Sequence, residues 1–243
     1  MSKGYRKTAF TLAEVLITLG VIGVVASLVL PGVVQRHKER ATITQLKKTY
    51  SVLQNAYRMA QEEYGYNFVL VDTSTRAAIS PKEFLDKISP YLDITVNCDE
   101  TKAFCVPSRR YHYSFLEKKG TNFWGTNNAI ILKDGTLIQI YSDYYAAIRI
   151  RVDVNGPKPP NHHGHDTFFF EMNMHTELNN YGKIAFQKIK PLGFDTTPAQ
   201  AKKLCSFNSS EQARGCAAWI LKNDNMDYLH CDLDWAVQTK CGK

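Results

Sequence analysis

Four features that the sequence lacks or nearly lacks narrow the functions open to this chain. Between Phe10 and Val34 the sequence has one ionised side chain, Glu14, in an otherwise almost wholly apolar run. Cysteine is absent from the first 97 residues. The sequence also has no Gly-rich phosphate loop, no nucleophile elbow and no H-E-x-x-H motif, so no motif points to an enzyme. Internal repeats and low-complexity linkers are absent too, which leaves one membrane segment and one globular domain as the expected organisation.

The apolar run is long enough to cross a bilayer, which takes about 20 residues. A carboxylate inside such a span costs roughly 2.5–3.5 kcal/mol at the helix centre. Glu14 lies near one end of the run, where the cost is lower. Its presence still requires a reason, and that reason is expected to be functional.

The residues around Glu14 form a recognisable pattern. A short basic leader containing Lys3, Arg6 and Lys7 is followed by Phe10-Thr-Leu-Ala-Glu14 and the uninterrupted apolar run. This arrangement resembles the N-terminal signature of type IV pilins and type II secretion pseudopilins. The resemblance implies that prepilin peptidase cuts between Ala9 and Phe10, that Phe10 is N-methylated and that Glu14 acts in subunit assembly.

Two further positions bear on this resemblance. Pro31 falls where many pilins also have proline, and a kink or local melting of the helix is expected there. The family strongly prefers glycine before the cut, whereas this chain has Ala9. An ordinary signal peptide cut near Ala26 and a plain uncleaved anchor are the alternatives, and neither explains Glu14.

Charge alone does not decide partners or orientation. The formal net charge of +7 falls to +4 without the three leader cations, which is too weak a bias to imply nucleic-acid binding, so DNA is not an expected partner. Arg36, Lys38 and Arg40 follow the apolar run and match the leader in number, so the positive-inside rule is nearly tied.

The six cysteines favour an oxidising compartment. An even number of cysteines in short local pairs is typical of disulfides, and none of the spacings is the C-x₂₋₄-C of zinc knuckles. Fifteen pairings are open, of which the sequential one is preferred. The preferred pairs are Cys98–Cys105, Cys205–Cys216 and Cys231–Cys241. The globular domain is therefore expected outside the cytoplasm. The resemblance to pilins implies that its single-pass anchor lies in the bacterial inner membrane.

A helical pattern continues beyond the apolar run. One stripe recurs at spacings of three and four and predicts an amphipathic helix that ends at Gly65. The stripe consists of Ile43, Leu46, Tyr50, Leu53, Tyr57, Ala60 and Tyr64, whereas Lys47, Lys48, Gln54, Arg58 and Gln61 lie off it and suit solvent. Packing onto a sheet is favoured over a coiled coil, because the stripe spans only about three heptads.

The rest of the chain predicts short helices and antiparallel strands. Ser80-Pro-Lys-Glu83 reads as a capping box that opens a helix through about Leu92. Strands are expected at 129–132, 137–141, 147–154 and 167–171, the first two joined at Asp134-Gly135. Helices are expected at 198–204 and 215–221. The fold class is α+β: a long N-terminal helix packed on a small antiparallel sheet, as in pilins, with a disulfide-tied C-terminal region.

One loop offers candidate metal ligands. Asp153, Asn155, Asn161 and Asp166 carry oxygens of the kind that calcium takes, and some pseudopilins hold calcium in a comparable late loop. Asx residues beside glycine and proline more often form turns, which is the favoured interpretation, so calcium is only a weak candidate cofactor.

Other residues in this part of the chain have simpler explanations. His162, His163 and His165 invite a zinc or nickel site but are expected to be exposed loop residues. The aromatic residues Phe168, Phe169, Phe170, Tyr141, Tyr144 and Tyr145 are expected in the core and on strand surfaces.

Together these patterns predict a structural subunit rather than an enzyme. Residues 1–9 would be a leader, 10–34 the transmembrane and assembly helix, 35–65 its amphipathic continuation and 66–243 the extracytoplasmic domain. The expected partners are prepilin peptidase, other pilin or pseudopilin subunits, the assembly platform and the membrane. The alternatives are a membrane-anchored binding module for adhesion or DNA capture and, more remotely, an extracytoplasmic enzyme that uses the histidine loop.

The first prediction concerns processing. We expect the mature protein to begin at Phe10 with a methylated amine, because the basic leader adjoins the Phe-Thr-Leu-Ala-Glu segment. Mass spectrometry of the N-terminal peptide from membrane-extracted protein measures this directly, and Ala9→Gly should be cleaved equally fast or faster. An N-terminus near Ser27, or an intact Met1, would contradict the prepilin interpretation.

Overall fold

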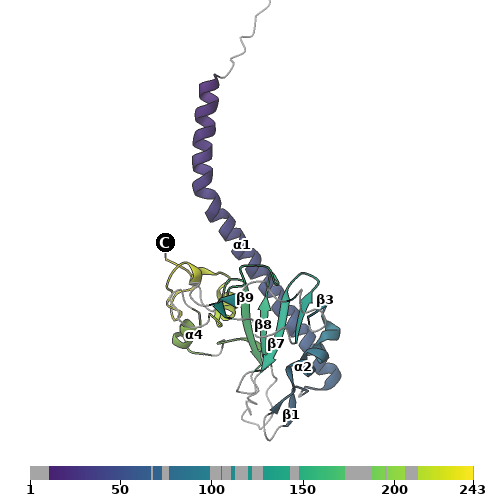
Figure 1. Cartoon of the computed structure of the whole chain (residues 1–243). Coiled ribbons are helices and arrows are strands. Elements are labelled where there is room, and N and C mark those ends of the chain that lie inside the picture. The colour runs from purple at the N-terminus through teal and green to yellow at the C-terminus, as the bar shows by residue number, and fades with distance from the viewer. Residues whose placement is uncertain are drawn as a thin grey trace, which may run out of the picture. The chain divides into compact units, whose positions relative to one another are not determined.

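The structure is a computed structural model that describes residues 11–66, 68–72, 77–98, 105, 111–112, 120–121, 128–142, 148–172, 188–194, 196–205 and 213–242. The chain divides into two compact units, Met1–Ala41 and Thr42–Lys243. Helix α1, Leu12–Tyr64, runs through the boundary between them (Figure 1).

Helix α1 is uninterrupted over its 53 residues. Helical structure continues through Pro31, so the helix does not melt there, and the kink expected at this residue stays a prediction. The helix ends where the sequence indicated. Gly65 adopts a φ of +89°, and its N–H donates to the Gln61 carbonyl over 3.0 Å. A glycine with positive φ ends the helix, and its N–H bonds one of the last carbonyls, which would otherwise have no partner within the helix.

In the second unit, α1 forms one side of the hydrophobic core. Five of the seven stripe residues are buried, whereas Tyr50 is half-buried and Tyr64 is 40% exposed. The buried five are Ile43, Leu46, Leu53, Tyr57 and Ala60. The expectation that Gln61 faces solvent is wrong, because its side chain is buried. Its amide donates to the Tyr57 hydroxyl over 3.2 Å and to the Tyr66 carbonyl over 3.3 Å. These hydrogen bonds offset the cost of removing a polar group from water.

The core is completed by a six-stranded antiparallel sheet with the strand order β10-β9-β8-β7-β6-β3. Its strands are β3 (Ile94–Asn97), β6 (Ala129–Leu132), β7 (Leu137–Ser142), β8 (Ile148–Asp153), β9 (Thr167–Met172) and β10 (Ile189–Pro191). Two small strand pairs lie outside it: β1 (Leu70–Asp72) with β2 (Ala77–Ala78), and β4 (Tyr111–His112) with β5 (Gly120–Thr121). The predicted α+β layout is therefore confirmed, and the stripe of α1 packs on a sheet rather than in a coiled coil.

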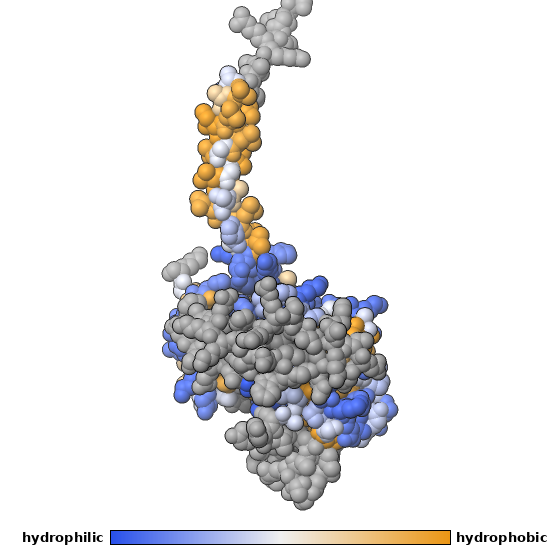
Figure 2. Space-filling view, viewed as in Figure 1, coloured by the Kyte–Doolittle hydropathy of each residue, from blue (hydrophilic) through white to orange (hydrophobic). Residues whose placement is uncertain are grey.

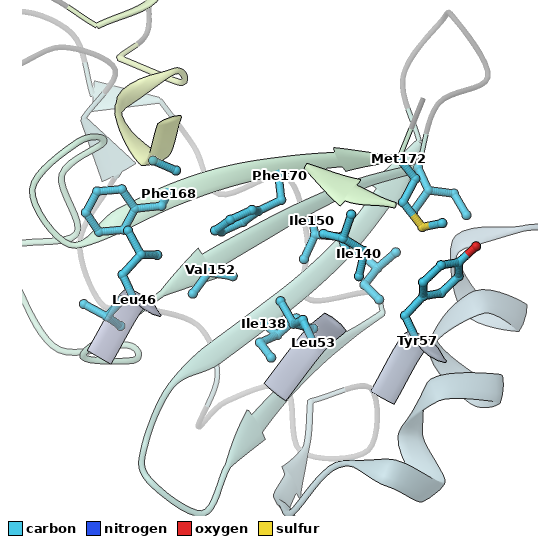
Figure 3. Packing of buried hydrophobic residues seen from close by; sticks show 14 of the residues in the cluster. Leu46, Leu53, Tyr57, Ile138, Ile140, Ile150, Val152, Phe168, Phe170 and Met172 are labelled. Atoms are coloured by element: carbon cyan, nitrogen blue, oxygen red, sulfur yellow. The ribbon is translucent and has the colours of Figure 1, made fainter. Parts of the chain in front are cut away.

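The two faces of the sheet differ in chemistry. On one face, Ile150 and Val152 of β8 lie with Ile138, Ile140 and Phe170 against α1 (Figure 3). The ring of Tyr50 stacks on Phe170 with centroids 5.3 Å apart. On the other face, Arg149 forms an ion pair with Glu171.

Also on that face, the Arg151 guanidinium lies over the rings of Tyr141 and Phe169, 5.8 and 5.6 Å from their centroids. The expectation that Phe168, Phe169 and Phe170 are core residues is confirmed, since none is more than 2% exposed. Tyr144 and Tyr145 lie outside the described residues.

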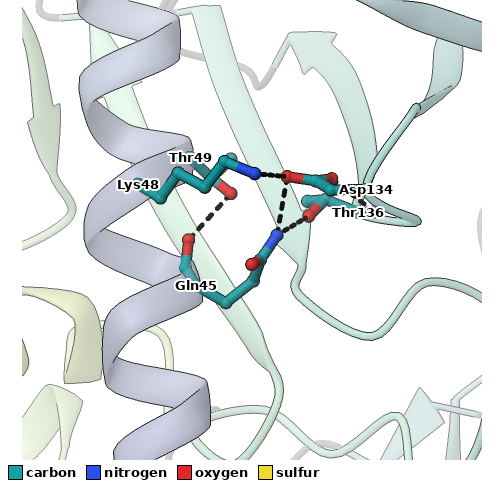
Figure 4. A network of polar contacts seen from close by, with 5 residues as sticks. All are labelled: Gln45, Lys48, Thr49, Asp134 and Thr136. Carbon is teal, nitrogen blue, oxygen red and sulfur yellow. Dashed lines mark hydrogen bonds and ion pairs between the residues drawn. The ribbon is translucent and has the colours of Figure 1, made fainter.

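The β6–β7 hairpin also holds α1 in place. Asp134, in the predicted Asp-Gly turn, accepts hydrogen bonds from Lys48 Nζ and Gln45 Nε2, each over 2.8 Å (Figure 4). Gln45 also donates to Thr136 Oγ1 over 2.8 Å. Burial alone would raise the pKa of Asp134, but the hydrogen bonds from Lys48, Thr136 and Gln45 outweigh it and lower the pKa to about 2. The turn thus fixes the helix to the β6–β7 end of the sheet through charge-assisted bonds.

Helix α2, Pro81–Ile88, begins where it was predicted. Ser80 is its N-cap, and Ser80 Oγ accepts the Glu83 N–H over 3.1 Å. The α-helix ends at Ile88 rather than near Leu92, and a 3₁₀ turn, η1 (Ser89–Tyr91), replaces its last part. Phe84 and Ile88 are fully buried, so the face of the helix that carries them joins the core.

The C-terminal region contains α4 (Pro198–Leu204), α5 (Cys216–Asn223) and the 3₁₀ turn η2 (Asp227–Leu229). The structure joins Cys98 to Cys105, Cys205 to Cys216, and Cys231 to Cys241, the three sequential pairs preferred from the sequence. Helix α5 contacts β9, and the Tyr228 hydroxyl donates to the Gly164 carbonyl over 2.7 Å. These contacts attach the tail to the edge of the sheet that ends in β9 and β10.

Candidate functional site

The first candidate site is the start of α1, where Thr11 and Glu14 form a reciprocal capping box. Glu14 Oε2 accepts the Thr11 N–H over 2.8 Å and the Thr11 hydroxyl over 2.9 Å. In return, Thr11 Oγ1 accepts the Glu14 N–H over 3.3 Å. Two of the N–H groups that a helix start leaves unpaired are satisfied in this way. Thr11 was not identified from the sequence, although Thr-x-x-Glu before an apolar run is the signal of such a box.

Glu14 keeps acceptor capacity beyond this box. Both bonds from Thr11 reach Oε2, and within the described part of the chain Oε1 accepts no hydrogen bond. An ionised carboxylate offers about four acceptor positions on two oxygens. The start of the helix therefore presents a carboxylate oxygen to any donor supplied from outside.

The helix that follows is apolar and uncovered in the first unit. Fourteen large apolar side chains between Leu12 and Val34 are 43–79% exposed, and Figure 2 shows them covering this part of α1. Among the described residues, α1 is the one helix long and apolar enough to cross a membrane by length and composition. This agrees with a single membrane pass.

Two hydroxyl side chains within this apolar stretch form hydrogen bonds to the backbone of their own helix. Thr18 Oγ1 donates to the Val15 carbonyl over 2.9 Å, and Ser27 Oγ donates to the Val24 carbonyl over 2.7 Å. Such back-bonding removes the cost of placing a hydroxyl in an apolar medium. Ala9 and Phe10, the predicted cleavage and methylation residues, lie outside the described residues.

The second candidate site is the loop between β8 and β9. The structure brings the proposed calcium ligands Asp153, Asn155 and Asp166 together, but as members of a hydrogen-bonded turn. Asp166 accepts the N–H groups of Asn161 and His162 over 2.9 and 2.6 Å, and the Asn155 side-chain amide over 3.2 Å. The Thr167 hydroxyl donates to Asp153 Oδ2 over 3.2 Å. Burial raises the pKa of Asp166 to about 6, even though these donors act in the opposite direction.

Asn161 closes the same turn. In the orientation that satisfies its polar atoms, its amide nitrogen donates to the Lys158 carbonyl and Asp153 Oδ2 over 3.0 Å, and to the Gly156 carbonyl over 3.3 Å. Calcium takes oxygen ligands, whereas the Asn161 side chain directs an N–H donor at these oxygens. Asn155 Oδ1 is a buried oxygen without a hydrogen-bond donor in the described residues, and one such oxygen does not make a site. The geometry supports the turn.

The three loop histidines are not the exposed residues that the sequence suggested. His163 is 1% exposed, and its ring meets Phe169 edge to face with centroids 4.7 Å apart. His162 and His165 are half-buried, with ring centroids 5.6 Å apart. Burial, followed by the nearby His162 and His230, lowers the pKa of His165 to about 4. Within the described residues, no group of three or more His, Cys, Asp or Glu side chains is arranged to hold a metal ion.

Comparison with known proteins gives no family assignment. No family model matches the chain, and no curated protein or solved structure is significantly similar to it. The function must therefore be argued from the two sites and the helix.

The loop geometry predicts weak calcium binding at most. Millimolar calcium should raise the melting temperature by no more than about 1 °C over the same sample in a chelator, because mass-action stabilisation requires a formed site. Thermal unfolding with calcium, and with magnesium as the matched ion, measures this. A rise of many degrees that Asp153→Asn abolishes would show that the loop is a calcium site.

The lowered pKa of His165 predicts that the contribution of this residue to the stability of the fold falls as the pH is lowered. Because the folded state holds its pKa at about 4, below the ordinary 6.5, His165 stabilises the fold fully above pH 6.5 and loses that contribution as the pH falls toward 4. The stability advantage of the parent protein over His165→Gln should therefore shrink by at most about 3 kcal/mol between pH 7 and pH 4.

Denaturant unfolding of both proteins at each pH tests this difference. Asp166 titrates in the same window with the opposite sign, but it is present in both proteins and cancels. Lys158→Gln, an exposed charge change in the same loop, is the control and should show a constant difference. A difference that is constant for His165→Gln as well would contradict the buried neutral imidazole.

Proposed function

We propose that this chain is a structural subunit, a pilin or pseudopilin, of a type IV pilus or type II secretion-like filament. In this proposal, prepilin peptidase removes residues 1–9 and Phe10 is then N-methylated. Residues 10–34 anchor the subunit in the bacterial inner membrane and later enter the filament core. The globular domain remains extracytoplasmic, in the periplasm or outside the cell, where the three disulfides are stable.

The observation that carries the proposal is the change of environment along one continuous helix. From Ile43 onward, α1 buries a stripe on its own sheet, whereas fourteen large apolar residues from Leu12 to Val34 are uncovered. Burying a side chain of this kind is worth about 1.5–3 kcal/mol, so leaving all of them in water would cost tens of kcal/mol. Lipid can cover them in the membrane, and the equivalent helices of neighbouring subunits can cover them in a filament.

Filament growth also needs a contact that repeats without closing. A heterologous interface of this kind generates an open helical assembly. Glu14 supplies a specific element of such an interface, because Oε1 is available while Oε2 holds the helix cap. In an apolar core, the methylated amine of Phe10 on a neighbouring subunit is a fitting cation for that oxygen. The pair would be favourable only if its attraction exceeds the cost of desolvating both charges.

A membrane-anchored binding module remains the alternative function. It would use the same helix as a permanent anchor and would not require Glu14 or processing at Phe10. Shearing cells and asking whether the protein copurifies with filaments separates the two functions. A minor subunit at a filament tip would do both, and its abundance in the sheared fraction would be low.

Glu14 variants test the assembly role. Glu14→Ala should insert into the membrane as well as the parent protein, because a costly charge leaves the span. Glu14→Gln should also insert, and it keeps the capping box, since glutamine serves at this position. Both variants should be strongly depleted from the sheared filament fraction at equal membrane levels, because the ion pair is lost in each.

Thr11→Ala is the matched control for this experiment. It removes the capping hydroxyl and leaves the Glu14 carboxylate, so its incorporation should stay close to that of the parent protein. The helix loses only a cap, worth about 0.5–2 kcal/mol. If Glu14→Gln assembles fully while Thr11→Ala does not, Glu14 acts as a helix cap. If all three variants assemble, the assembly role of Glu14 is rejected.

A further inference from the structure

The C-terminal region contains a half-open cavity of about 350 Å³ that the proposed filament role does not use. It lies where the turn after β10 meets α4, α5 and the segment around Trp235. Its lining is Gly193, Phe194, Thr196, Pro198, Ala201, Ala218, Leu221, Lys222 and Trp235. The volume falls within the range of small-molecule sites, roughly 300–1,000 Å³, and the lining is mostly apolar as such sites are.

The walls of this cavity are fixed by covalent and close-packed contacts. The Cys205–Cys216 disulfide joins the end of α4 to the start of α5. A Cβ on Gly193 would lie 2.8 Å from Leu204 Cδ1, and one on Gly215 would lie 2.7 Å from Leu204 Cβ. Glycine at both positions therefore lets the turn and α5 close tightly on Leu204. A cavity with such walls is formed before a ligand arrives, which reduces the ordering cost of binding.

Two aromatic side chains, Phe194 and Trp235, line the cavity. Trp235 is half-buried, and one side of it packs on Trp219 with centroids 4.7 Å apart. The Trp219 indole N–H donates to Asn225 Oδ1 over 2.8 Å, which fixes the ring behind Trp235. Phe194 is 54% exposed, although phenylalanine is ordinarily buried. An aromatic ligand would find ring surface on both residues.

Lys222 is the one charged side chain in the described lining. It lies in the last turn of α5, is exposed and forms no ion pair or hydrogen bond among the residues that the structure describes. By contrast, Lys202 of the neighbouring helix α4 is paired with Asp232 over 3.1 Å. No carboxylate belongs to the described lining, which therefore places one positive charge beside an apolar, aromatic surface.

We propose that this cavity binds an aromatic group that carries one carboxylate. The ring would lie against Phe194 and Trp235, and the carboxylate would pair with the Lys222 ammonium. An apolar cavity of roughly 150 Å³ holds a benzene molecule, so about 350 Å³ accommodates a fused two-ring system with its acidic substituent. A free aromatic acid and an aromatic residue at the C-terminus of a peptide share this chemistry.

The test uses the full chain in lipid nanodiscs, with empty nanodiscs as the blank. Titration calorimetry with 2-naphthylacetate should show saturable binding. The neutral 2-naphthylethanol should bind about threefold to fivefold more weakly, as expected for one exposed ion pair. Lys222→Gln should weaken naphthylacetate by the same factor and leave naphthylethanol unchanged. Phe194→Ala should weaken both ligands, and it should fold normally because Phe194 is largely exposed.

Two controls make the outcome decisive. Lys240→Gln removes an exposed lysine of the same region that is outside the lining, and it should bind as the parent protein does. The peptide Gly-Gly-Trp with a free carboxylate, compared with its amide, identifies the source: tighter binding than naphthylacetate indicates a peptide C-terminus, weaker binding a free acid. Absence of saturable binding by both the acid and the peptide overturns the proposal. Equal binding of the neutral analogue, with no effect of Lys222→Gln, overturns it as well.

Discussion

The structure depends on one constraint: the two parts of helix α1 need different surroundings. The first part is apolar on all sides and uncovered, and the second part buries one stripe in the protein core. An α-helix bonds its own backbone, so α1 can pass from an apolar medium into a protein core without exposing unpaired N–H or C=O groups. Only the side chains have to change, and they do so over a few residues. Before Val34 apolar residues point in every direction, whereas from Ile43 onward they keep to one stripe. An all-round apolar helix requires apolar cover on all sides, and a one-sided stripe requires a single sheet.

The globular unit is built to hold that stripe. Leu46, Leu53 and Tyr57 supply one half of the core, and the strands β7, β8 and β9 supply the other (Figure 3). Polar contacts then fix the helix at two places, the turn between the inner strands β6 and β7 and the edge strand β10. Asp134 binds Lys48 and Gln45 at the β6–β7 turn, and the Ile189 carbonyl of edge strand β10 accepts Gln54 Nε2 over 2.6 Å and the Tyr50 hydroxyl over 3.1 Å. An edge carbonyl that would otherwise be unpaired is thereby covered.

What the sequence could predict follows from how local each signal is. The stripe of α1, the Asp134-Gly135 hairpin and the strand β8 depend on side-chain period and turn chemistry, and all three were predicted. Strands β3 and β10 were not, because β3 has an irregular register and β10 is three residues long with Pro191 at its end, which an edge strand tolerates. The burial of His163 and His165 involves Phe169 of β9 and His230 of the tail, which no local pattern encodes. The Thr11–Glu14 capping box was not predicted, although its Thr-x-x-Glu signal is local.

The tail shows how a region with little regular structure becomes rigid. Its two disulfides close sequence separations of 11 and 10 residues, so each stiffens the tail internally and neither ties it to the sheet. Attachment instead comes from α5 packing on β9 and from the Tyr228 hydroxyl on the Gly164 carbonyl. That bond reaches the same loop in which Asp153 and Asp166 accept buried hydrogen bonds. The polar turn therefore needs no metal to have a purpose: its hydrogen bonds hold the Gly164 carbonyl in place, and that carbonyl positions the tail and the cavity beside it.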